Sequence, residues 1–240
     1  MALIEFLGVP GVGKTTLARS TAGRLRQSGQ EVVFLPMDAA VNLDRWPDRA
    51  RGLIEVAGHA FMRPGQMLRS VGMVRLFPQP SLMASIKTLG YWLCTDALVH
   101  KHAAGTTFLV LDQGFYQGLY SWVLLRPQLN FAQLLAAMSR VPKPDLLVVV
   151  TAPPATIRTR LSERCFTHRW IDRLLLEDQK WIDKSAAMIA LIERAARATD
   201  CSIVHCEASN GVEQCTREIL AAIGRHWAVK AQPGCAETPS

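Results

Sequence analysis

Short apolar runs recur along the chain, and most of them show no alternation of polar and apolar positions. Near-continuous runs of this kind are typical of strands that are buried on both faces of a parallel sheet. Runs rich in apolar and β-branched residues predict five strands, and they cover residues 3–7, 32–35, 107–111, 146–150 and 202–205.

Helical periodicity separates several of these runs. It predicts a helix over residues 14–28 that Gly29 closes, a long helix over about 170–198, and a third over about 212–227. Strands that alternate with helices indicate parallel strands joined by helical crossovers. The pattern therefore predicts an α/β protein.

A long segment, residues 38–105, separates the second predicted strand from the third and exceeds what a simple crossover needs. We expect it to form a helical insertion beside the sheet, cut into short pieces by its prolines and glycines. These are Pro47, Gly52, Gly58, Pro64, Gly65, Gly72, Pro78, Pro80 and Gly90. The whole chain is predicted to form one domain over residues 1–229, followed by a flexible tail over 230–240.

Composition agrees with one sizeable core, since 49% of the 240 residues are hydrophobic. The formal net charge of +7 favours anionic partners. The six cysteines are scattered without a C-x-x-C pair, which indicates reduced thiols. We find neither a basic leader followed by a long apolar stretch nor an unbroken stretch that could span a membrane, so we expect a cytoplasmic protein that does not enter a membrane.

The sequence GVPGVGKTT, residues 8–16, lies between the first predicted strand and the first predicted helix. It fits the pattern G-x-x-x-x-G-K-S/T, in which backbone N–H groups surround phosphate oxygens and the helix N-terminus adds a positive charge. Lys14 would bridge the β- and γ-phosphates, and the Thr15 hydroxyl would bind Mg²⁺. The alternative is an ordinary glycine-rich turn. The residues predicted to bind ATP here are Gly8, Gly11, Val12, Gly13, Lys14, Thr15 and Thr16.

The third predicted strand ends in Asp112, where P-loop proteins place a carboxylate on the Mg²⁺ side of the phosphates. Asp112 would therefore complete the metal site with Thr15, although an Asp at this position can also simply open a turn. Gln113 follows, where many ATP-driven machines have a glutamate that activates water, so efficient hydrolysis is not indicated. The absence of D-x-x-G and N/T-K-x-D motifs argues against GTP.

Arginines follow the fourth predicted strand, in a helix that Pro153 or Pro154 can start. Arg160 and Arg164 are four residues apart and would share one face, and Arg169 comes next. A guanidinium that closes over a transferring phosphoryl group stabilises its charge, so we predict a catalytic lid over about 155–175. The alternative is a solvated basic face.

These motifs together resemble the P-loop kinases of the nucleoside and nucleoside-monophosphate kinase type, thymidylate-kinase-like proteins included. The matching segments are GVPGVGKTT, FLPMD, LVLDQG and PDLLVVVTAPPATIRTRLSER. The resemblance implies a P-loop NTPase fold with a five-stranded parallel sheet in the order 2-3-1-4-5, flanked by helices. It also implies that ATP binds at the loop, with its adenine near Ala208 and Asn210, and that the acceptor lies under the insertion. The chain lacks the D-R-Y/F of thymidylate kinases and the D-G-x-P-R of adenylate kinases.

Candidate acceptor residues follow the second strand and the magnesium-side acid. Asp38 could orient a hydroxyl acceptor and take its proton, or it could cap a turn. Arg45 and Arg49 could bind an anionic acceptor, or they could face solvent. Phe115 and Tyr116 could stack on a planar acceptor, or they could belong to the core. We favour a hydroxyl over a phosphate acceptor because Asp38 directly follows its strand.

The predicted function is that of a small-molecule kinase that transfers the γ-phosphoryl of Mg²⁺-bound ATP. A P-loop ATPase that couples hydrolysis to a partner and an ATP-sensing regulator are the alternatives. No nucleic-acid-binding motif accompanies the basic residues, and a homodimer is compatible with the sequence. The identity of the acceptor is left open.

Overall fold

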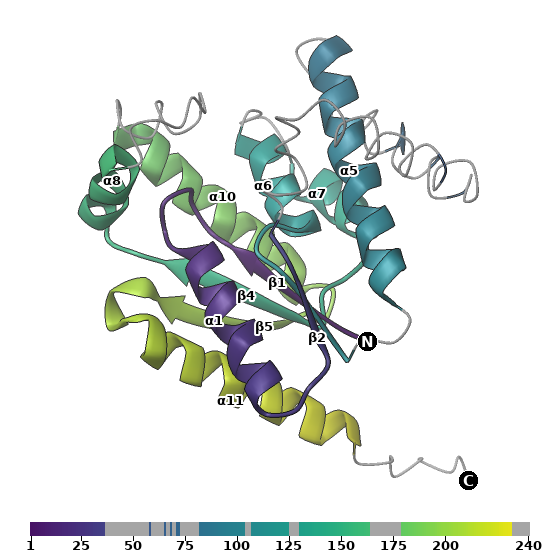
Figure 1. Cartoon of the computed structure of the whole chain (residues 1–240). Coiled ribbons are helices and arrows are strands. Elements are labelled where there is room, and N and C mark those ends of the chain that lie inside the picture. Colours follow the sequence, from purple (N-terminus) through teal and green to yellow (C-terminus); the bar gives the residue numbers. More distant parts are fainter. Residues whose placement is uncertain are drawn as a thin grey trace, which may run out of the picture.

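The computed structural model describes residues 1–36, 82–103, 107–124, 130–163 and 179–231, together with the isolated positions 58, 65, 68, 71 and 72. These residues contain a five-stranded sheet in the order β2-β3-β1-β4-β5, and all neighbouring strands are parallel (Figure 1). The strands are β1 (Ala2–Leu7), β2 (Val32–Leu35), β3 (Phe108–Leu111), β4 (Leu146–Thr151) and β5 (Ser202–Glu207). The predicted fold class and strand order are confirmed, and the architecture is that of a P-loop NTPase.

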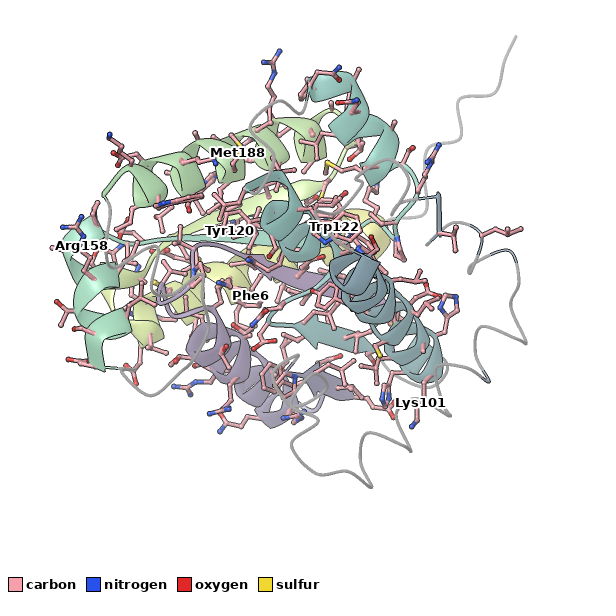
Figure 2. The ribbon with its side chains drawn as sticks, turned by 90° about the horizontal axis from the view of Figure 1, so that it is seen from above. Phe6, Lys101, Tyr120, Trp122, Arg158 and Met188 are labelled. Carbon is pink, nitrogen blue, oxygen red and sulfur yellow. The ribbon has the colours of Figure 1, made fainter. Side chains whose placement is uncertain are left out.

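Helices cover both faces of this sheet (Figure 1). One face carries α1 (Lys14–Gln27) and α11 (Val212–Ala231). The other face carries α5 (Leu82–Ala103), α6 (Phe115–Leu124), α7 (Phe131–Met138) and α10 (Gln179–Arg197). A further helix, α8 (Pro154–Glu163), follows β4, and a short 3₁₀ turn, η1 (Ala208–Asn210), follows β5. Viewed from above, Arg158 of α8 and Lys101 of α5 lie on opposite sides of the molecule (Figure 2).

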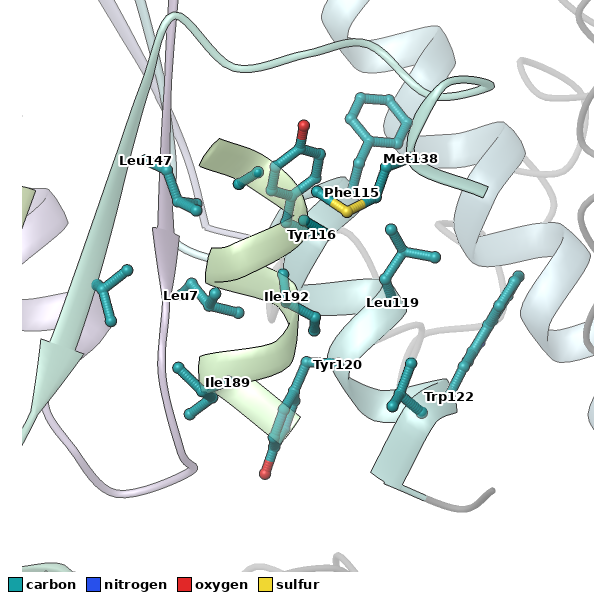
Figure 3. Close-up of a cluster of buried hydrophobic side chains, with 14 of the residues drawn as sticks. Leu7, Phe115, Tyr116, Leu119, Tyr120, Trp122, Met138, Leu147, Ile189 and Ile192 are labelled. Atoms are coloured by element: carbon teal, nitrogen blue, oxygen red, sulfur yellow. The ribbon is translucent and has the colours of Figure 1, made fainter. Parts of the chain in front are cut away.

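Strand side chains alternate between two apolar clusters, which explains the continuous apolar runs. In β1, Leu3 and Leu7 contribute to the cluster beneath α6 and α10, whereas Ile4 and Phe6 contribute to the cluster beneath α1 and α11. Figure 3 shows the first of these clusters, where the side chains of α6 pack between the sheet and the neighbouring helices. Burial on both faces therefore fixes the register of the central strands.

The helix α5 differs from the expectation that the insertion forms only short pieces, because it spans 22 residues and continues through Gly90. A glycine inside a helix costs only about 1 kcal/mol relative to alanine. Burial of the α5 side chains Trp92, Leu93 and Val99 offsets that cost. The expectation was therefore wrong for this part of the insertion, because packing outweighs local helix propensity here.

The structure can be compared with the cysteine prediction at four positions. The four described cysteines, Cys94, Cys201, Cys206 and Cys215, are free thiols, and the last three are buried. Among the described helices, we find no apolar stretch of the length that a membrane span requires. The residues 170–178, predicted to begin the long helix, lie outside the described residues, and α10 begins at Gln179.

Candidate functional site

The glycine-rich loop, residues 8–13, links the central strand β1 to α1 at the carboxyl edge of the sheet. Gly11 and Gly13 have φ angles of 83° and 108°, a backbone region that favours glycine. An added β-carbon on Gly8 would lie 2.6 Å from the carbonyl oxygen of Val150, so the loop packs closely on β4. Backbone geometry therefore requires glycine at three positions of the predicted motif.

Lys14 is the first residue of α1, and its side chain turns back over the loop. Its Nζ donates to the carbonyl oxygen of Gly8 at 2.7 Å and to that of Val9 at 3.1 Å. Only 8% of the residue is exposed, so solvent screens this charge weakly. The positive end of α1 and the ammonium of Lys14 therefore both lie at the loop, which makes it a suitable site for an anion.

Thr15 and Asp112, the two predicted metal ligands, meet beside the loop. The Thr15 Oγ1 donates to the Asp112 Oδ2 at 2.7 Å. Asp112 directly follows β3, the neighbour of β1 in the sheet, and is fully buried. A carboxylate and a hydroxyl are the hard oxygen donors that Mg²⁺ prefers, so the chemistry of this pair fits the predicted ion.

Arg160 is the one predicted lid arginine that the structure describes, and it contacts the loop. Its Nη1 donates to the carbonyl oxygen of Val12 at 2.8 Å. Its helix, α8, begins at Pro154 as predicted and packs on the loop, because a β-carbon on Gly11 would lie 2.9 Å from Leu161. Arg164 and Arg169 lie outside the described residues.

The described structure includes only two of the acceptor-side candidates, Phe115 and Tyr116. Asp38, Arg45 and Arg49 lie outside the described residues. Phe115 and Tyr116 are only 1% and 0% exposed and belong to the cluster beneath α6 (Figure 3). This placement supports the core alternative for both aromatic residues. The reason is that α6 begins at Phe115 and packs directly against α5 and the sheet.

The predicted adenine contacts lie at the carboxyl edge of β5, the same edge of the sheet as the glycine-rich loop. Ala208 packs partly against the core, and Asn210 is exposed. Along the loop and α1, Val12 is buried and Thr16 is exposed. These nucleotide contacts stay predictions.

Sequence reasoning missed two buried residues, Glu5 and Gln117, that contact the loop or each other. The Gln117 Oε1 accepts a hydrogen bond from the Gly8 N–H at 3.0 Å, and the Gln117 N–H donates to the Glu5 Oε1 at 2.8 Å. Burial raises the pKa of Glu5 to about 7, although backbone N–H groups at the start of α6 act in the opposite direction. One feature of the sequence could have pointed to Glu5, since it is a single charged residue within the otherwise apolar first predicted strand.

The raised pKa of Glu5 predicts a pH-dependent stability. The folded chain binds this proton more tightly than the unfolded chain, so the free energy of unfolding should fall as pH rises from about 4.5 to about 7. The loss from this group should be about 3 kcal/mol. Glu5→Gln should lack this contribution, and urea unfolding of both proteins between pH 4.5 and 8 measures the difference. Parallel stability curves for the two proteins would contradict the prediction.

Tyr91 of α5 fixes the turn between Asp112 and α6. Its hydroxyl donates to the carbonyl oxygen of Gly114 at 2.8 Å. Burial, and then the charges of Glu5 and Asp112, raise the pKa of Tyr91, so the hydroxyl stays protonated and available as a donor. The last helix of the insertion is therefore joined to the turn that carries the predicted metal-binding carboxylate.

No protein-family model matches the chain. The chain is similar to thymidylate kinases. It is 29% identical over 167 residues to the proteins of that name from Xanthomonas campestris pv. campestris strains B100, 8004 and ATCC 33913. The match covers 68% of this chain but 61% of each relative, so the chain spans less than two thirds of their length. The resemblance to thymidylate-kinase-like proteins that the motifs indicated is therefore confirmed, at the level of a distant relative.

Proposed function

We propose that this protein is an ATP-dependent phosphotransferase whose acceptor is a small molecule, with nucleotides as the favoured class. The observation that carries the proposal is the Thr15–Asp112 pair beside a glycine-rich loop that also holds Lys14. Three separate segments supply these groups, namely the loop after β1, the start of α1 and the residue after β3. Such an arrangement suits a nucleoside triphosphate with a divalent cation better than it suits a simple anion.

Each of these residues has a distinct part in the proposed reaction. Backbone N–H groups of the loop would bind phosphate oxygens, and Lys14 would balance the negative charge of the β- and γ-phosphates. Thr15 and Asp112 would hold Mg²⁺, which when bound neutralises charge on the same phosphate oxygens. Little covalent chemistry is required of the protein, because positioning and charge stabilisation supply most of the catalysis.

A nucleotide acceptor is supported by the similarity to proteins named thymidylate kinase, since thymidylate is a nucleotide. The net charge of +7 also favours a phosphorylated acceptor over a neutral one. The earlier preference for a hydroxyl acceptor depends on Asp38, which lies outside the described residues, so it stays a prediction. Transfer is favoured over hydrolysis because Gln113, and not a glutamate, follows Asp112.

The test is ADP release under Mg²⁺-ATP, measured with and without a panel of nucleoside monophosphates, nucleosides and sugars. Thymidylate is the first acceptor to try, and mass spectrometry identifies the product. Acceptor-dependent ADP release with one phosphoryl group added to a nucleotide would support the proposal. Equal ADP release without any acceptor would indicate an ATPase, and ATP binding without turnover would indicate a regulator.

Arg160 gives a prediction about the lid. We expect Arg160→Ala to lower kcat by about 10- to 100-fold and to change KM for ATP much less, if the guanidinium acts mainly in the transition state. Steady-state kinetics with the identified acceptor measure both constants. Arg158→Ala is the matched control, because it removes an arginine from the same helix that makes no hydrogen bond to the loop in the described structure. A kcat that stays at the wild-type value per folded molecule would leave Arg160 with a structural role only.

A further inference from the structure

A buried hydrogen-bonded series connects β1, α6 and the glycine-rich loop. Glu5 of β1 accepts from the backbone of Gln117, and the side chain of Gln117 accepts from the backbone of Gly8. Glu5 is 0% exposed and Gln117 is 5% exposed, so water competes weakly for either bond. Through these two hydrogen bonds, Gln117 of α6 is linked to Glu5 and to Gly8, the first residue of the loop, although it lies more than a hundred positions away from both.

Close packing and two hydrogen bonds hold Gly8 in place, and Gln117 accepts one of these hydrogen bonds. A β-carbon on Gly8 would come within 2.6 Å of the Val150 carbonyl oxygen and 2.9 Å of the Val12 side chain. The carbonyl oxygen of Gly8 accepts from the ammonium of Lys14, while its N–H donates to Gln117. Gln117 therefore fixes the residue that Lys14 contacts, and a backbone N–H buried at this point needs such a partner.

The helix that carries Gln117 is itself held firmly at its start. A β-carbon on Gly114 would lie 2.6 Å from the Glu5 Cδ, so the first turn of α6 packs directly on this carboxyl group. Tyr91 donates to the carbonyl oxygen of the same glycine. Asp112 lies two residues before Gly114. The same buried contacts therefore set the position of the Asp112 turn and of the loop.

We propose that Gln117 is a positioning residue for the glycine-rich loop, holding Gly8 so that Lys14 and Thr15 face the phosphates while Thr15 stays beside Asp112. Glu5 supports this role by binding the backbone of Gln117. The proposal deepens the proposed function and depends on it, because the ligand it concerns is the triphosphate of a nucleotide. It assigns Gln117 no contact with the ligand itself.

The experiment compares Gln117→Met with Tyr120→Phe in the whole 240-residue chain. Methionine has nearly the length of glutamine and lacks its amide oxygen. Tyr120→Phe is the matched control, because it removes a buried hydrogen bond of the same helix, to Ser185 at 3.0 Å, on the side that faces α10. The measurements are the Mg²⁺-dependent affinity for a non-hydrolysable ATP analogue, by calorimetry, and the exchange rate of the Gly8 amide hydrogen, by NMR.

We expect Gln117→Met to bind the analogue about tenfold more weakly and to exchange the Gly8 amide about tenfold faster. Tyr120→Phe should change neither value, although both variants should lower the urea midpoint. The proposal is overturned if Gln117→Met keeps wild-type affinity and Gly8 exchange, or if Tyr120→Phe weakens binding equally. If the wild-type chain does not bind the analogue, the proposed function fails, and Gly8 exchange alone decides whether Gln117 positions the loop.

Discussion

Lys14→Ala is expected to lower kcat roughly a thousandfold or more, the largest effect of any single substitution in the loop. The ammonium of Lys14 lies over the start of the glycine-rich loop and is only 8% exposed. Arg160 contacts the other end of the loop, at Val12, so it does not take the place of Lys14 beside Gly8. The measurement is the steady-state rate of transfer from ATP to the identified acceptor, with both substrates saturating.

The structure also predicts that Lys14→Ala lowers the stability of the fold. Lys14 donates to two carbonyl oxygens of its own loop, so alanine should also cost about 2 kcal/mol in the free energy of unfolding. Kinetics should therefore be measured at a temperature where urea unfolding shows that the variant is folded. Lys101→Ala, which removes an exposed lysine of α5, is the control and should retain wild-type turnover. Unchanged turnover in Lys14→Ala would remove the loop from the site.

Asp112→Asn is expected to lower kcat roughly 100-fold or more and to raise the Mg²⁺ concentration needed for half-maximal rate. Asparagine keeps the size of the side chain and an oxygen that can accept from Thr15, so the fold should tolerate it. The negative charge is lost, however, and the pair becomes a poor ligand for a hard divalent cation. Initial rates over a Mg²⁺ titration measure the effect.

Asp145→Asn provides the matched control for that titration. Asp145 also has a structural hydrogen bond, in which its Oδ2 accepts from the Leu3 N–H at 2.9 Å, but it lies at the opposite end of the strands. Its loss should therefore change stability and leave the Mg²⁺ dependence unaltered. If Asp112→Asn shows the wild-type rate and metal response, Asp112 is not part of the reaction.

Most of the fold could be predicted because short, continuous stretches of the sequence determine its strands and its loop. The strands are short, apolar and buried on both faces, so each appears as a continuous run in the sequence. The glycine-rich loop is equally local, since motif, strand and helix adjoin within residues 1–28. The pairing of Thr15 with Asp112 was predictable too, because parallel strands bring their carboxyl ends to one edge of the sheet.

The remaining parts of the site depend on long-range packing, which sequence pattern does not reveal. Glu5 and Gln117 are 112 residues apart, and nothing in either segment points to the other. Helical periodicity could not decide whether Phe115 and Tyr116 face the core or a ligand, because both lie at the start of a helix beside the site. Gly90 led to the wrong prediction that the insertion breaks there, because one glycine destabilises a helix less than the burial of its apolar side chains stabilises it.

The hydrogen bond from Tyr91 to Gly114 limits how this protein could be re-engineered. A substrate-recognition segment that is merely attached to a catalytic scaffold can be exchanged for a foreign one. Here α5, the last helix of residues 38–105, holds the turn that follows Asp112, so a chimaera that replaces this whole segment should disturb the proposed metal site as well as any acceptor site that the segment forms. A productive graft should join the foreign segment upstream of Tyr91 and retain the rest of α5 from this chain.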